Sequence, residues 1–392
     1  MRTFNAALTL LLTLLNVCYA APFIPASDDV VLETLPFKAN DPVNGELRRL
    51  RAELSQDPQN LAKAVTLAQR YYQLALADGD PRYIGYAEAA LAPWWELAEP
   101  PVAVLVQRAA LRQYTHQFDS ALADLNLAIS RSPKHGTAWS LRAAIHMVLA
   151  DYATARQDCE QLQGQASKLI VTACIAAVDS LNGNAGQAYN TLLATHTATP
   201  SAAPREKLWV LTRLAEMSDR LGRTQDADSY FKQALKLNIN DAYLLAVYAE
   251  FLHDEQRYDE VIALLGDKQR SDVLLMRLTL AEQASNAPAA AKHIEVIRAR
   301  FDAARLRGDK LHIQDEARFN LYLLNNSTEA LRLAQVNWLG QHEPSDARIL
   351  LETALAAKDK SAAQPAVDWF EKSRIEDWHL QKLINAVKAF NQ

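Results

Sequence analysis

The sequence predicts an all-α protein, a right-handed α-solenoid of about eight helix-turn-helix repeats with a C-terminal capping helix. Two observations predict this fold class. Small residues recur in pairs twelve positions apart, at a period near 34 residues, and bulky residues follow each pair at helical spacing. The clearest pairs are Ala109/Ala121, Ala143/Ala155, Ala176/Ala188, Ala215/Ala227 and Ala354/Ala366, and Ala249/Val261 fits with one substitution.

The residues around each pair define the second helix of the repeat. A bulky residue stands four positions after the second small residue, and in three repeats another apolar residue stands three positions further on. The spacing i, i+4, i+7 lies along one face of a helix. Pro133 then ends one such helix, and short polar breaks such as residues 182–184 separate the two helices of a unit. The bulky residues are Leu125, Cys159, Leu192, Phe231, Leu265 and Phe370.

Packing explains why this pattern repeats. Two antiparallel helices need small residues where their backbones approach, and bulky residues fill the groove to the next pair. A single helix pair cannot bury its own apolar face, whereas a stack of pairs can. The array is predicted over residues 59–374, with an inserted loop near Pro200 and Pro204. The first unit and residues 273–307 depart from the pattern and are expected to pack differently or to present special surfaces.

This repeat resembles the tetratricopeptide repeat (TPR) family. The matching residues are Ala121, Leu125, Ala128 and Pro133 in one unit, and Trp139, Ala143, Tyr152 and Ala155 in the next. The resemblance implies a scaffold that binds a protein or peptide in a concave groove lined by the first helix of each unit. The partner-binding candidates that it implies are Trp209, Arg213, Glu216, Arg220, Tyr243, Glu250 and His253.

Residues 1–20 have the pattern of a secretory signal peptide. Arg2 precedes an apolar stretch, and small residues at Cys18 and Ala20 suit cleavage after Ala20. The alternatives are a short membrane anchor and a lipoprotein signal at Cys18, which Val17 fits poorly. The expected location is therefore the periplasm or the exterior, with no transmembrane segment in the mature chain.

Two cysteines remain after that cleavage, Cys159 and Cys174. They stand fifteen residues apart, on helices that the repeat places side by side. An exported protein can join them in a disulfide, and the alternative is two small buried thiols.

Both ends of the array need a cover, because a solenoid exposes apolar surface there. Residues 375–392 carry Trp378, Leu383 and Val387 near helical spacing and are predicted to form the capping helix. The alternative is an amphipathic helix that binds a partner. Residues 21–58 are predicted to be an extended segment and cap that folds back on the first repeats, or a peptide that docks on a partner.

Signatures of enzymes and metal sites are absent from the sequence. The cysteines lack CxxC spacing, the nine histidines form no HExxH, and there is no GxSxG. We therefore expect no enzyme activity, metal or cofactor. The formal net charge of −5 argues against a general nucleic-acid binder.

An alternative function is a binding module for an envelope glycan or lipid. It is motivated by the aromatic residues of the N-terminal third, Tyr71, Tyr72, Tyr83, Tyr86, Trp94 and Trp95. The competing interpretation is that these rings fill the core of the first repeats.

Overall fold

The computed structural model describes residues 27, 41–309 and 311–389. The predicted signal peptide, with Cys18 and Ala20, and most of segment 21–40 lie outside the described residues. The chain divides into two units, Met1–Arg49 and Leu50–Gln392. In the first unit, the described residues include the start of helix α1 (Pro42–Gln56), where Asp41 Oδ1 accepts the backbone N–H of Val43 at 2.8 Å.

The second unit is built of helices, and the described residues contain no strand. Its helices are α2 (Leu61–Asp78), α3 (Arg82–Trp95), α4 (Val102–Tyr114), α5 (Phe118–Arg131), α6 (Gly136–Val148), α7 (Tyr152–Glu160), α8 (Lys168–Ser180), α9 (Ala185–Thr197), α10 (Pro204–Arg220), α11 (Thr224–Leu235), α12 (Ala242–Asp254), α13 (Tyr258–Leu265), α14 (Asp272–Ala284), α15 (Ala290–Leu306), α16 (Ile313–Arg318), the π-helix η1 (Phe319–Leu323), α17 (Ser327–Trp338), α18 (Pro344–Ala357), α19 (Lys360–Ser373) and α20 (Trp378–Ala389).

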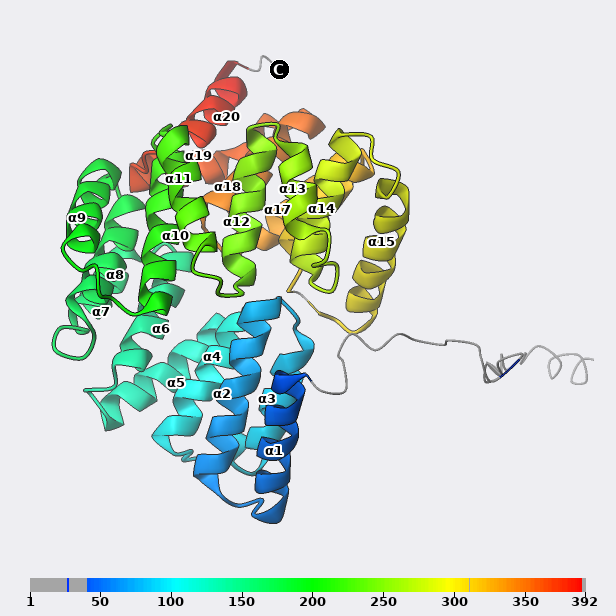
Figure 1. The fold of residues 1–392 in the computed structure, drawn as a ribbon. Helices are drawn as coiled ribbons and strands as arrows, with labels where there is room; N and C mark the ends of the chain where they lie inside the picture. The colour runs from blue at the N-terminus through cyan, green and yellow to red at the C-terminus, as the bar shows by residue number, and fades with distance from the viewer. Residues whose placement is uncertain (1–26, 28–40, 310, 390–392) are drawn as a thin grey trace, which may run out of the picture. The chain divides into compact units, whose positions relative to one another are not determined.

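Consecutive helices form nine packed pairs, from α2/α3 to α18/α19, and α20 packs on α18. The even-numbered helix of each pair also contacts the even-numbered helix of the next pair. At one step the contact is indirect, because α14 contacts η1, which continues α16. These first helices therefore form one continuous layer, which we call the inner layer (Figure 1). The arrangement is the α-solenoid that the repeat predicts.

The alanine pairs lie where the two helices of a unit meet. Ala109 is on α4 and Ala121 on α5, and the other pairs are divided in the same way between successive helices. All of these alanines are buried, as are Ala249 and Val261. The structure thus confirms that the 34-residue period marks close helix packing.

The turns inside the pairs repeat as well. His116, Ala150, Gly183, Gly222 and Gln256 all have positive φ, between 58° and 78°, and stand at equivalent positions of successive units. At each turn the first helix ends, and the residue after the turn residue donates its N–H to the carbonyl five positions earlier. After Gly222, for example, the Arg223 N–H donates to Ser218 O at 2.8 Å.

Two ion pairs, each with a buried aspartate, recur with the same period. Arg108 on α4 is bidentate to Asp124 on α5, at 2.9 and 2.6 Å. Arg142 on α6 is bidentate to Asp158 on α7 at the same distances. Each pair joins the two helices of its unit, and the partner atoms satisfy one another where burial would otherwise be costly.

The last units contact the middle of the array. Figure 1 shows α17, α18 and α19 behind α10–α14. Trp378 Nε1 donates to the Asp219 carbonyl at 2.9 Å, the His342 N–H donates to Val148 O at 2.8 Å, and Glu376 accepts the Ala185 N–H at 2.5 Å. Leu380, Ile384 and Val387 of α20 are buried.

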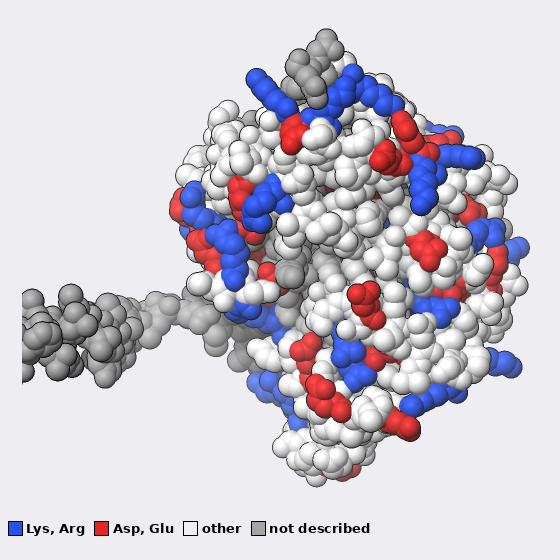
Figure 2. Space-filling view, turned by 180° about the vertical axis from the view of Figure 1, so that it is seen from behind, with Lys and Arg blue, Asp and Glu red and all other residues white. Residues whose placement is uncertain are grey.

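The visible surface mixes both signs of charge. Figure 2 shows Lys and Arg interspersed with Asp and Glu over this face, without an extended area of one sign. No helix of the described chain is long and apolar enough to span a bilayer.

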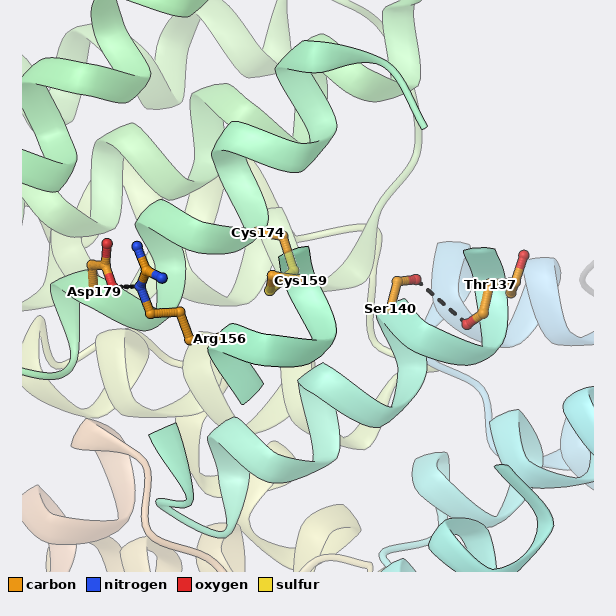
Figure 3. The surroundings of a disulfide bond; sticks show 6 residues. All are labelled: Thr137, Ser140, Arg156, Cys159, Cys174 and Asp179. Atoms are coloured by element: carbon orange, nitrogen blue, oxygen red, sulfur yellow. Dashed lines mark hydrogen bonds and ion pairs between the residues drawn. A yellow bond between two sulfur atoms is a disulfide. The ribbon is translucent and has the colours of Figure 1, made fainter. Parts of the chain in front are cut away.

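A disulfide joins α7 to α8. Cys159 and Cys174 are bonded, with their Cα atoms 5.5 Å apart, and both side chains are buried (Figure 3). Arg156 Nε donates to Asp179 Oδ1 at 3.0 Å between the same two helices. Of the two alternatives left open by the sequence, the structure contains the bond.

Candidate functional site

The seven partner-binding candidates lie on two neighbouring helices of the inner layer. Trp209, Arg213, Glu216 and Arg220 are on α10, and Tyr243, Glu250 and His253 are on α12. The structure divides them into two groups and leaves two of them in packing positions.

Arg213, Glu216 and Tyr243 form the first group, which we call the α10–α12 patch. Arg213 Nε lies 2.9 Å from Glu216 Oε2, and the Tyr243 hydroxyl donates to Glu216 Oε1 at 2.5 Å. The Arg213 guanidinium also stacks on the Tyr243 ring, 4.9 Å from its centroid. The Arg213–Glu216 contact is ionic and lacks hydrogen-bond geometry, so the hydroxyl hydrogen bond and the ring stacking are what orient Tyr243.

Tyr243 is both accessible and surrounded by protein. Its side chain is 50% exposed, yet burial among neighbouring atoms raises the pKa of its hydroxyl group. The phenol therefore remains protonated at neutral pH and keeps donating to Glu216. The exposed ring and the guanidinium together offer an apolar surface with a fixed charge.

Trp209 and Arg220 lie outside this patch. Trp209 is partly buried and packs against the cores formed by α6 to α10. Arg220 Nη2 donates to Ser180 Oγ at 2.8 Å, which ties α10 to α8. Both side chains hold neighbouring units together.

Glu250 and His253 belong to the second group, which we call the arginine cluster. Its other charged or hydroxyl-bearing members are Asp254, Arg277, Arg318, Tyr322, Arg348 and Glu352. Glu250 lies between three guanidinium groups, 3.2 Å from Arg318 Nη2 and 3.7 Å from both Arg277 Nη2 and Arg348 Nη1. Burial alone would raise the pKa of Glu250, but the three arginines outweigh it and lower the pKa to about 2. Glu250 is therefore ionised at physiological pH.

Arg348 links the last units of the array to the middle. It reaches from α18 to α12, where Nη1 and Nη2 hold the two oxygens of Asp254 at 2.6 and 2.7 Å. Its Nε donates to Glu352 on its own helix at 2.9 Å. Such a bidentate contact fixes direction as well as distance. Arg348 and Asp254 are 94 residues apart in the sequence.

A π-helical turn places the remaining members of the arginine cluster. Helix α16 ends at Arg318 and continues as η1, where the Leu324 N–H donates to Phe319 O at 3.1 Å. Arg318 and Tyr322 thereby both reach the cluster, where Tyr322 donates its hydroxyl proton to Glu352. Arg277 on α14 is paired with Asp315 on α16.

The arginine cluster surrounds a cavity of about 170 Å³. His253 also faces it, and burial lowers the pKa of that imidazole, which is neutral at pH 7. No group of side chains suited to a metal ion occurs among the residues that the structure describes. The lining residues are Glu250, His253, Asp254, Arg277, Leu280, Arg318, Tyr322, Arg348 and Glu352.

Sequence reasoning missed Arg277, Arg318 and Arg348. One signal was present, because Glu250 follows Ala249 and Arg318 follows Ala317, and both alanines are buried small residues of the repeat. Equivalent positions of two first helices thus carry opposite charges. The curvature that brings them together was not visible in the sequence.

Three of the six aromatic residues of the N-terminal third pack on one another. The rings of Tyr71, Tyr83 and Tyr86 have centroids 5.5 to 6.3 Å apart. Tyr71, Tyr83 and Trp94 are buried, and only Tyr86 of these four is exposed, at 54%. The packing therefore favours the core interpretation over a glycan platform.

The fold defines a helical-repeat protein, and comparisons with known proteins add the following similarities. No family model and no curated protein sequence matches the chain. Similar solved structures include a tetratricopeptide repeat protein from Parabacteroides merdae, at 14% identity and a TM-score of 0.42 over 65% of this chain and 91% of that one. Yeast Tom70 is similar at 12% identity and a TM-score of 0.26 over 88% and 96%. The complex of Naa15/Naa10 bound to HypK-THB is similar at 13% identity and a TM-score of 0.26 over 88% and 63%.

These similarities are too low to carry an argument about function. The fold class rests on the paired helices and buried alanines of this chain, and these agree with the repeat resemblance stated from the sequence.

Proposed function

We propose that this chain is an exported, non-enzymatic scaffold of the cell envelope that binds a protein or peptide partner through the inner layer of its solenoid. The observation that carries the proposal is the α10–α12 patch, in which Arg213 stacks on the half-exposed Tyr243 and Glu216 holds both.

The chemistry of this patch suits recognition of a protein surface. Arginine and tyrosine are among the side chains that most often supply binding energy at protein interfaces. Because Tyr243 is already hydrogen-bonded to Glu216 and stacked on Arg213, less of its rotamer entropy remains to be lost when a partner binds. Glu250 and His253 lie in the arginine cluster, outside the patch that carries this proposal.

Two features support the export part of the proposal. The N-terminal twenty residues have the composition of a signal peptide, and a buried disulfide suits an oxidising compartment. Fractionation of cells expressing the full chain, with mass measurement of the product, tests this part. Recovery of uncleaved chain with free thiols would contradict it.

A site-specific crosslinking experiment tests the binding part. A photo-crosslinking residue at Tyr243 is expected to capture a defined envelope protein, and Tyr243→Ala and Arg213→Ala are each expected to weaken binding of that protein about tenfold or more. Tyr86→Ala is the matched control, because Tyr86 is equally exposed but lies on α3, outside the inner layer. Equal binding by all three variants would refute the assignment of the patch.

A further inference from the structure

The cavity in the arginine cluster has the size of a small-molecule site. Its volume is about 170 Å³, and a cavity of about 150 Å³ holds a ligand as large as benzene. Tyr322 is 42% exposed, so the cavity communicates with solvent on the side of η1. Side chains from α12, α14, α16, η1 and α18 line it. A ligand of about six to ten non-hydrogen atoms would contact five elements at once.

Two arginines of the wall have donors to spare. A guanidinium has five N–H donors. Among the described residues, Arg318 makes a side-chain hydrogen bond to Glu250, at 3.2 Å, and Arg277 makes one to Asp315. Their other ionic contacts, at 3.7 and 3.8 Å, exceed hydrogen-bonding distance. Arg277 and Arg318 can therefore bind an additional carboxylate.

The charges of the residues that line the cavity balance, because three guanidinium groups face three carboxylates, those of Glu250, Asp254 and Glu352. Asp315, which pairs with Arg277 and lies 3.8 Å from Arg318 Nη1, adds a fourth carboxylate beside the cavity. A ligand with a net negative charge would therefore lack a counterion in this site. An uncharged apolar ligand would leave polar wall groups unpaired. A molecule that carries one charge of each sign avoids both costs.

We propose that this cavity binds a small zwitterion of the α-amino acid class, with its carboxylate on Arg277 and Arg318 and its ammonium group on the wall carboxylates. This site is separate from the α10–α12 patch and goes beyond the scaffold function. Because the ligand would contact α12, α14, α16, η1 and α18 together, its binding would stabilise the contact between the middle and the last units.

Calorimetric titration of the full chain tests the proposal. The probes are L-serine, L-glutamine and L-glutamate, each with its N-acetyl and amide derivatives, and inorganic phosphate as a simple anion. At least one free amino acid is expected to bind with a Kd below about 1 mM, and loss of either charge is expected to weaken binding about tenfold or more. The thermal unfolding midpoint should rise with the same ligand.

Variants distinguish this cavity from other sites. Arg318→Gln is expected to abolish binding, and Leu280→Trp fills the cavity while keeping every wall charge. Arg142→Gln is the matched control, because Arg142 forms a similar, partly buried ion pair with Asp158 away from the cavity. The proposal is overturned if no free amino acid binds with a Kd below about 1 mM, if phosphate or an acetylated probe binds equally well, or if Leu280→Trp binds like the unmodified chain.

Discussion

The repeated turn at Gln256 provides a quantitative test of the repeat geometry. Gln256 has φ of 59°, in the left-handed region, and its side chain is exposed. This conformation costs a non-glycine residue about 1–2 kcal/mol. Gln256→Gly removes that cost, and the greater freedom of glycine in the unfolded chain returns about 0.4–1 kcal/mol. The net expected gain is about 0.5–1 kcal/mol in the free energy of unfolding.

Two controls separate the backbone effect from the side chain. Gln256→Ala deletes the same side chain but keeps the strain, so it is expected to be neutral within about 0.3 kcal/mol. Gly222 occupies the equivalent turn one repeat earlier, with φ of 71°. A Cβ there would meet Trp378 at 3.8 Å, an ordinary contact, so Gly222→Ala should lose about 1 kcal/mol through backbone strain.

Urea titration and thermal unfolding, followed by circular dichroism at 222 nm, measure these changes. For a unit of this size, the gain from Gln256→Gly corresponds to an increase of about 1–3 °C in the unfolding midpoint. Equal midpoints for the glycine and alanine variants at position 256, or a neutral Gly222→Ala, would refute the assignment of these turns.

Three further predictions concern packing, covalent structure and pH. Ala249→Leu overfills the α12–α13 interface and should cost about 2 kcal/mol in urea titration, whereas a neutral result would deny close approach of these helices. Cys174→Ser opens a disulfide with a sequence separation of 15 and should cost about 3 kcal/mol, with the same loss when the unmodified chain is reduced; stability unchanged by reduction would contradict it. Burial, followed by the charge of Asp346, raises the pKa of Glu343 to about 7, so the folded state holds a proton that the unfolded state releases near pH 4.5. The stability of the unmodified chain should therefore fall as pH rises from about 4.5 to about 7, and Glu343→Gln, measured by thermal unfolding across this range, should flatten that dependence; parallel profiles would exclude Glu343 as the cause.

The repeat could be recognised in the sequence because its signal is local. Ala109 and Ala121 are only twelve positions apart, and the packing of their helices depends on little outside the unit. The same holds for the turn residues, since Gly183 and Gly222 occupy conformations that glycine favours. Helix pairing and the fold class were therefore predictable from the period alone.

The arginine cluster was less predictable because it depends on the accumulated curvature of many units. Each repeat adds a small rotation, and only the sum brings Arg348 to Asp254, 94 residues earlier. The π-helical turn after Arg318 also has no sequence signature comparable to the alanine pairs. Glu250 and His253 were predicted as groove residues, and the structure places them against charged partners from the last three units.

The contact between α12 and α18 is the feature on which the placement of the last units depends most directly. A double-mutant cycle with Asp254→Asn and Arg348→Gln measures it through the free energy of unfolding, with the exposed pair Glu329 and Arg332 as the reference. We expect a coupling of about 1.5–3 kcal/mol for Asp254 with Arg348 and below about 0.5 kcal/mol for the reference pair. Additive effects of the Asp254 and Arg348 substitutions would show that the last units do not lie against the middle of the solenoid.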